Sequence, residues 1–233
     1  MERGSLTTSS RASLKREGRR AQQHNNMYDP ESVPLFFKST MKKSCVSGDV
    51  GSYQFLSNFF PFVSAPEAQP ASSVPLLKSG HSSFLSSEHL YQWAKFATIR
   101  DYEYAKILRH APTAQECKRL SLKGAYQEHL QRKFPKSSKA SLRRKTDRIF
   151  ARRFSRGKCK LIMRKALELK FDPDRNDSLC KALVETYPRK LCEHDRAREG
   201  SKWGISPTTG EGENLLGKLL MERRSYLIKY YST

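Results

Sequence analysis

The chain has 233 residues, which is long enough for one well-filled hydrophobic core plus a tail and too short to favour several domains. Its 44 lysines and arginines exceed its 23 acids by 21. Folding does not require such an excess, which points to a polyanionic partner such as nucleic acid, or to a phosphorylated ligand. The five cysteines are scattered and form no C-x-x-C pair, so they argue against a zinc motif and favour free thiols in a reducing intracellular compartment.

The sequence gives no support for membrane or metal classes. No apolar run approaches the length of a membrane-spanning helix, and the basic, serine-rich start lacks the apolar stretch of a secretory signal. No cluster of residues suggests a metal, and no cofactor is expected. We therefore expect an intracellular protein without a membrane partner, located in the cytoplasm or, alternatively, in the nucleus.

The first part of the chain is predicted to contain a tail and two short extended segments. Residues 1–30 are polar and basic, so they are expected to form a disordered tail, and residues 31–233 one folded domain. VPLFFK (Val33–Lys38) predicts a short strand. YQFLSNFFPF (Tyr53–Phe62) predicts an aromatic strand or a turn, interrupted by Asn58.

The remainder of the chain is mostly helical in pattern. We predict helices over Phe84–Phe96, Asp101–His110, Ala111–Leu120 with Thr113 as its cap, Cys159–Phe171 and Asp177–Thr186, then a short strand over Arg189–Glu193 and a long helix over Leu215–Tyr230. Together these elements predict an α+β fold, a mostly helical single domain with a small sheet.

Positive charge is concentrated in the window Arg132–Lys160. It contains thirteen lysines and arginines and a single acid, Asp147, for a local charge of +12. Two interpretations remain open: a solvated helix face with a flexible loop, or a surface that follows the phosphates of a nucleic acid.

The predicted helix over Phe84–Phe96 carries the most informative polar pattern. Glu88, Gln92 and Lys95 are spaced so that they lie on one side of a helix. An acid and an amine on one face can serve catalysis. Ordinary helix electrostatics offers the alternative, in which Glu88 complements a helix start capped by Ser86 or Ser87 and Lys95 is solvated.

Four separated segments give that helix a context. Their residue types and order resemble the NADAR family of YbiA-like proteins, over about Tyr53 to Arg224. The segments are FLSNFFPF (Phe55–Phe62), SSEHLYQWAKF (Ser86–Phe96), AQECKRL (Ala114–Leu120) and WGISPTTGEGENLLGKLLMERR (Trp203–Arg224).

The resemblance implies an N-glycosidase that hydrolyses a ribosyl C–N bond. Its substrate would be either a ribosylamino-pyrimidine 5′-phosphate of riboflavin biosynthesis or ADP-ribosylated guanine in nucleic acid. A non-catalytic, basic nucleic-acid-binding module on the same fold is the alternative.

The resemblance also implies roles for the two charged residues. Cleavage of a ribosyl C–N bond develops positive charge on the sugar, which Glu88 would stabilise or relieve by directing a water. Lys95 matches the family lysine and would attack C1′ to form a Schiff base, or bind the sugar. Seven helical residues separate them by about 10 Å along the axis, so each would contact a different part of one ligand.

The expected substrate-binding residues each have a structural alternative. The Asn58 amide would orient the ribose or base, or merely permit the turn, while Phe59 would stack on the base or fill the core. Gln92 completes the polar face of the helix. Trp203 and Gly204 resemble the wall of the family pocket, although a tryptophan here can also anchor the core.

Two departures from the family pattern and one helix cap complete the expectations. Asn214 is expected to cap the final helix. The start of that helix could also bind a phosphate. Many relatives carry an aspartate three residues before the tryptophan, where this chain has Gly200. We favour Glu199, with Asp195 as the alternative, as the replacement carboxylate. The basic stretch between Leu122 and Arg153 is also longer and more charged than the family usually needs.

Overall fold

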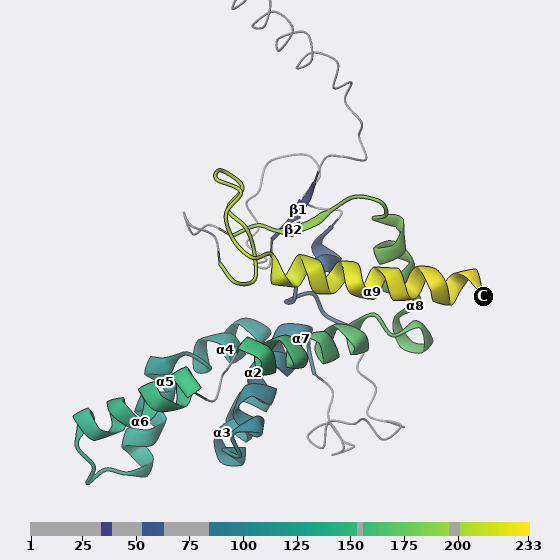
Figure 1. Ribbon diagram of the computed structural model, residues 1–233. Coiled ribbons are helices and arrows are strands. Elements are labelled where there is room, and N and C mark those ends of the chain that lie inside the picture. Colours follow the sequence, from purple (N-terminus) through teal and green to yellow (C-terminus); the bar gives the residue numbers. More distant parts are fainter. Residues whose placement is uncertain (1–33, 39–52, 63–83, 153–155, 196–200) are drawn as a thin grey trace, which may run out of the picture.

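Two strands that lie far apart in the sequence form the sheet of this protein. The computed structural model describes residues 34–38, 53–62, 84–152, 156–195 and 201–233 (Figure 1). Strands β1 (Leu35–Phe37) and β2 (Leu191–Glu193) pair in parallel, with Leu35 opposite Leu191. Both leucines are buried. The two predicted strands are confirmed, and the expected tail over residues 1–30 lies outside the described residues.

Helices make up most of the described chain. Their bounds are α2 (Ser87–Thr98), α3 (Tyr102–Arg109), α4 (Ala114–Leu120), α5 (Lys123–Lys133), α6 (Lys139–Arg152), α7 (Arg156–Lys170), α8 (Pro173–Glu185) and α9 (Leu215–Ser232). Together with the two-stranded sheet they confirm the predicted mostly helical α+β fold. No helix in the described ranges is long and apolar enough to cross a membrane.

Side-chain caps define where three helices begin. The hydroxyl oxygen of Ser86 accepts a hydrogen bond from the His89 amide at 3.2 Å, which fixes the start of α2. Asp101 and Thr113 accept in the same way at the starts of α3 and α4. Each bond satisfies an amide that the first helical turn leaves without a partner. The predicted caps at Ser86 and Thr113 are confirmed.

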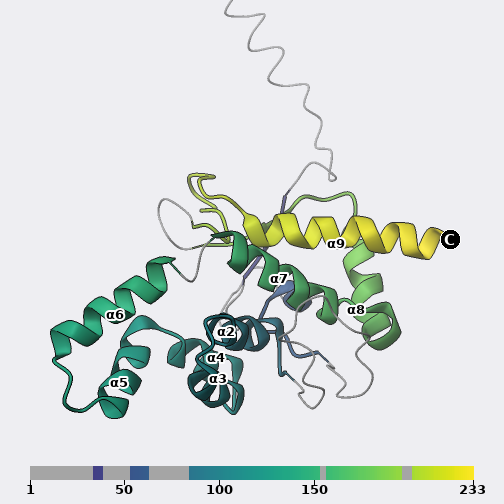
Figure 2. The same ribbon diagram turned by 60° about the horizontal axis from the view of Figure 1, so that its bottom comes forward.

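Helix α2 lies at the centre of the fold, where it contacts α3, α4 and α7 (Figure 2). Its C-terminal half ends in an aromatic cluster, in which the Phe96 ring lies 4.9 Å from Tyr104 and 5.1 Å from Tyr126 between centroids. Ten of its twelve residues are buried, including polar ones. A helix surrounded in this way exposes very little to solvent, so most of its polar side chains lie inside the protein.

Helices α5 and α6 form an antiparallel pair that was not predicted as two helices. We call residues 123–152 the basic hairpin. In Figures 1 and 2 it stands at one end of the molecule, at the opposite end from α8. Leu142 and Thr146 are buried on its inner side, and the Phe150 ring contacts those of Phe96 and Tyr126. The hairpin is therefore joined to the core at its base.

The structure decides the type of one segment that was left open and moves several helix boundaries, most of all the start of α8. The segment Tyr53–Phe62 forms a 3-10 turn, η1 (Gln54–Leu56), followed by further turns, so the turn alternative was the right one. Helix α8 begins at Pro173 rather than Asp177, with Asp172 as its cap. Asn176 has non-helical dihedral angles inside α8, and this interruption hides the first turn from a periodicity analysis.

Candidate active site

The turn that contains Asn58 is held against the beginning of α2. Pro61 and Ser86 form an antiparallel bridge, and the Glu88 amide donates a 2.8 Å hydrogen bond to the Asn58 carbonyl. The Asn58 side chain is buried, and its Oδ1 has no hydrogen-bond partner among the described residues. The sequence prediction that Asn58 and Glu88 belong to one site agrees with this arrangement, and the role of Asn58 toward a substrate stays a prediction.

A buried lysine binds the backbone of the same turn. Lys170, the last residue of α7, has 0% exposure and donates a 2.7 Å hydrogen bond to the Ser57 carbonyl. Its ammonium lies 5.7 Å from the centroid of the Phe60 ring. Burial lowers the pKa of Lys170 to about 7. Sequence analysis missed this residue because the basic positions of an amphipathic helix are normally expected to face solvent.

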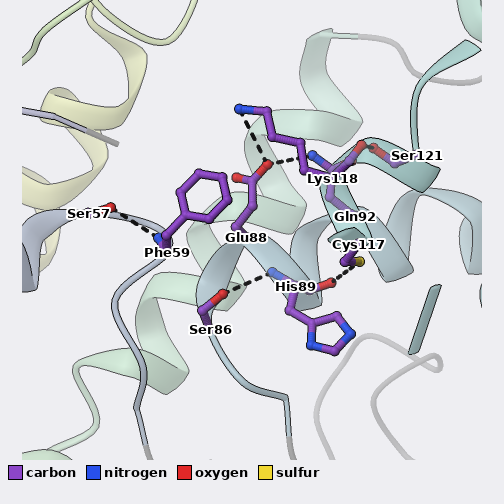
Figure 3. Close-up of polar contacts among 9 residues, drawn as sticks. All are labelled: Ser57, Phe59, Ser86, Glu88, His89, Gln92, Cys117, Lys118 and Ser121. Carbon is purple, nitrogen blue, oxygen red and sulfur yellow. Dashed lines mark hydrogen bonds and ion pairs between the residues drawn. The ribbon is translucent and has the colours of Figure 1, made fainter. Parts of the chain in front are cut away.

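Glu88 is buried and held by two side chains (Figure 3). Only 5% of the residue is exposed. Its Oε1 accepts a 2.7 Å hydrogen bond from Gln92 Nε2 and lies 3.9 Å from Lys118 Nζ on α4. The alternative in which Glu88 only complements the helix start does not explain this burial. Gln92 was predicted as a site residue, whereas Lys118 was missed although it lies within the family-like segment AQECKRL.

Phe59 lies beside Glu88 in Figure 3, and its ring is buried. Lys118 Nζ is 5.2 Å from the centroid of that ring, so the ammonium interacts with both the aromatic face and the carboxylate. The structure therefore brings three side chains together from three separate elements: Phe59 from the turn, Glu88 from α2 and Lys118 from α4.

Lys95 is half-buried near the other end of α2. Its Nζ lies 5.2 Å from the centroid of the Tyr91 ring, and that ring meets Trp203 edge-on at 5.5 Å. Burial lowers the pKa of Lys95, and the negative charge of Glu88 partly opposes this shift. Tyr91, which was not predicted as a site residue, thus lies between Lys95 and Trp203, the residue predicted to form the pocket wall.

Glu193 is a second buried carboxyl group that sequence analysis missed. It ends β2 and is 8% exposed. The pKa of Glu193 is raised to about 8, chiefly by burial and also by the negative charges of Glu88 and Asp195, while the positive charge of Lys118 partly opposes the shift. Its electrostatic coupling to Glu88 and Lys118 places all three groups in one charged environment. The strand pattern RKLCE contained no signal that its acid would face inward.

Asn214 is the N-cap residue of α9, as predicted, but its side chain binds β2 and not the first turn of the helix. Its Oδ1 accepts a 3.0 Å hydrogen bond from the Glu193 amide, and its Nδ2 donates to the Leu191 carbonyl at 2.8 Å. No side-chain cap bond forms to α9, so the predicted cap was wrong in its bonding. Asn214 has a φ of 50°, a left-handed conformation that asparagine tolerates, and this geometry turns its amide toward the strand.

A glycine is required at position 204 because its backbone packs closely against β2 of the same chain. A Cβ atom at this position would lie 2.6 Å from the Glu193 carbonyl oxygen. The close approach expected for a ligand is therefore made by β2. Among the candidate replacement carboxylates, Glu199 lies outside the described residues, whereas Asp195 is described and acts electrostatically on Glu193.

The fold and these side chains define a helical α+β domain whose central helix carries the buried carboxylate of Glu88 and the half-buried amine of Lys95. The chain belongs to the NADAR domain family, whose model matches residues 36–228. The resemblance based on four sequence segments is thereby confirmed. No curated protein matches the chain.

Proposed function

We propose that this protein is an N-glycosidase that hydrolyses a ribosyl C–N bond. The observation that carries the proposal is the environment of the central helix. It presents a buried carboxylate held by two donors and, two turns further, an amine whose positive charge is disfavoured by burial. Membership of the NADAR family supports the same reaction class.

Glu88 would act on the sugar. Departure of the base leaves positive charge shared between C1′ and the ring oxygen, and a fixed carboxylate in a water-poor site stabilises that charge strongly. The hydrogen bond from Gln92 and the ion pair with Lys118 restrict the orientation of Glu88. The carboxylate therefore needs little reorganisation when the charge develops.

Lys95 would act as the nucleophile. The Nζ lone pair forms a bond to C1′ while the C1′–N bond breaks, and the bonding pair leaves with the base nitrogen, which takes up a proton. Nζ loses a proton, opening of the sugar ring gives a Schiff base, and water then hydrolyses it to regenerate the amine. A lowered pKa favours this step because only the neutral amine has a free lone pair.

Glu193 would supply the proton that the leaving base requires. Its raised pKa keeps the carboxyl group protonated near neutral pH, whereas Glu88 is held by cationic and amide donors. Two carboxyl groups in different environments can divide acid and charge-stabilising roles.

The substrate is one of two classes: ribosylamino-pyrimidine 5′-phosphates or ADP-ribosylated guanine. Both contain a ribosyl C–N bond, a phosphate and a planar heterocycle. Lys118 offers a cation for phosphate, and the rings of Phe59 and Trp203 offer surfaces for the heterocycle.

The direct test incubates the purified protein with each substrate class and follows released base, pentose phosphate or ADP-ribose by mass spectrometry. Lys95→Ala and Glu88→Gln should each reduce release by at least about 100-fold. Lys106→Ala and Glu211→Gln, which change exposed residues of the same types, are the matched controls. Full activity in both site variants would remove this assignment of the site.

Borohydride trapping tests the covalent route separately. Reduction during turnover should attach the sugar to Lys95, as located by peptide mass spectrometry. Turnover without a trapped adduct would assign Lys95 to binding only. Absence of release from either substrate class, in a folded protein that still binds nucleic acid, would favour the non-catalytic alternative.

A further inference from the structure

We propose that the basic hairpin is a docking arm for duplex nucleic acid and that it contacts the sugar-phosphate backbone. Residues 123–152 carry ten lysines and arginines and two acids, for a formal charge of +8. This inference goes beyond the proposed glycosidase reaction, because it concerns a surface built by α5 and α6 and requires no turnover.

The acids of the basic hairpin are already engaged. Asp147 forms an ion pair with Lys123, and Glu128 lies 3.8 Å from Arg132. Six further cations are exposed, and none has an acid within 4 Å among the residues that the structure describes. They are Lys136, Lys139, Arg143, Arg144, Lys145 and Arg148.

These cations are unfavourable for the hairpin on its own. Lys139 and Arg143, and again Arg144 and Arg148, are four residues apart on α6, a spacing at which like charges destabilise a helix by about 0.2–0.5 kcal/mol per pair. Binding a polyanion reverses the sign of this contribution. The charge pattern therefore suits a nucleic acid better than it suits an isolated helix.

The other face of α6 fixes the arm to the core. Leu142 and Thr146 are buried, and the Phe150 ring lies 6.3 Å from Phe96 between centroids. By helical spacing Arg144 and Arg148 lie opposite these residues, one turn apart and therefore about 6 Å along the axis. The outward cations thus sit on a helix whose orientation is set by core packing.

The scarcity of exposed aromatic rings decides which form of nucleic acid fits. Within residues 123–152 the only exposed aromatic side chain is Phe134, and Lys145 Nζ covers its ring at 4.7 Å. Single-strand binding relies on bases stacked on aromatic side chains, whereas a duplex offers its phosphates without unstacking. The surface is therefore matched to the phosphates of a duplex backbone, which can be contacted without reading base sequence.

The arm also leads toward the candidate active site. The chain passes from Lys118, beside Glu88, through Ser121 directly into α5 (Figure 3). If the proposed reaction holds, a duplex on the arm would favour nucleic-acid-linked substrate over a free nucleotide. Binding of unmodified duplex is independent of that reaction, so the two proposals can fail separately.

The test measures binding of a short unmodified DNA duplex by fluorescence anisotropy over a range of salt concentrations. Arg144→Glu/Arg148→Glu should weaken binding at least about tenfold near physiological salt and lower the salt slope by about 2, because two phosphate contacts are lost. Lys218→Glu/Lys229→Glu on α9 changes the net charge equally at two other exposed positions and should alter affinity less than about threefold. Circular dichroism confirms that both variants are folded.

Three outcomes would overturn the proposal. The first is equal weakening by the α9 control, which would reduce the effect to overall charge. The second is tighter binding of the single strand than of the duplex, which would favour base stacking elsewhere. The third is equally tight binding of polyglutamate, which would indicate an acidic protein partner.

Discussion

The candidate active site and the basic hairpin use the same residue types in opposite ways. Lys170 is enclosed, donates to a backbone carbonyl and has its pKa lowered by burial. Lys139 stands in solvent on α6. Burial lowers the pKa of a lysine and fixes its ammonium in a hydrogen bond, whereas an exposed lysine stays charged and attracts anions over a longer range.

The two regions differ most in how tightly they are packed. Two helical glycines show this difference, because one has room for a Cβ atom and the other does not. A Cβ at Gly217 in α9 would lie 2.2 Å from the Leu191 carbonyl oxygen, whereas one at Gly124 in α5 would meet nothing within 4 Å. Gly217→Ala should destabilise the protein by about 3 kcal/mol or more, because backbone must move. Gly124→Ala should stabilise it by up to about 1 kcal/mol. Denaturant unfolding of the two variants measures both changes. Equal changes in the free energy of unfolding would show that the two regions are packed equally tightly.

A second difference is chemical. Glu193→Gln keeps the shape of the side chain but cannot transfer a proton, so kcat should fall about 100-fold. The wild-type rate should decline above about pH 8, where Glu193 loses its proton, and the variant should lack that decline. A pH–rate profile of both proteins checks this. Parallel profiles would assign Glu193 to structure alone.

The buried lysine Lys170 should make the stability of the protein depend on pH. Its folded-state pKa is about 7, below the ordinary value of 10.5, so between these values the unfolded chain binds more protons and stability rises with pH. Relative to Lys170→Met, the wild type should gain up to about 1.4 kcal/mol per pH unit above pH 7. Denaturant unfolding at pH 7 and pH 9 measures the gain. Lys139→Met, which removes an exposed amine, is the control, and an equal gain against both variants would contradict the prediction.

The smallest expected difference separates two serine caps. Ser86 is buried and caps α2, while the exposed Ser138 accepts from the Ser141 amide at the start of α6. Ser86→Ala should cost about 1–2 kcal/mol and Ser138→Ala about 0.5 kcal/mol, because water can replace only the exposed bond. Thermal unfolding of the two variants ranks them. The reverse order would show that the hairpin contributes more stability than its contacts indicate.

The sequence predicts local structure better than it predicts the site. Ser86 and Thr113 cap α2 and α4 through hydrogen bonds to residues only three positions away. The sequence therefore predicts both caps, and the structure confirms them. Lys170 and Glu193 were missed because their environments are created by residues distant in the sequence. The position of Asn214 at the start of α9 was predicted correctly, but the bonds of its side chain were not, because only the position of β2 reveals them.

The hydrogen bond between Lys170 and the Ser57 carbonyl joins residues 113 positions apart, and β1 pairs with a strand that is separated from it by most of the chain. Loops of this length close late, after local helices have formed. On the ribosome, α2 to α4 can assemble while the N-terminal turn still lacks its lysine and strand partners. The contacts that hold the Asn58 turn and the sheet are therefore completed near the end of synthesis, after all residues of the basic hairpin have been added to the nascent chain.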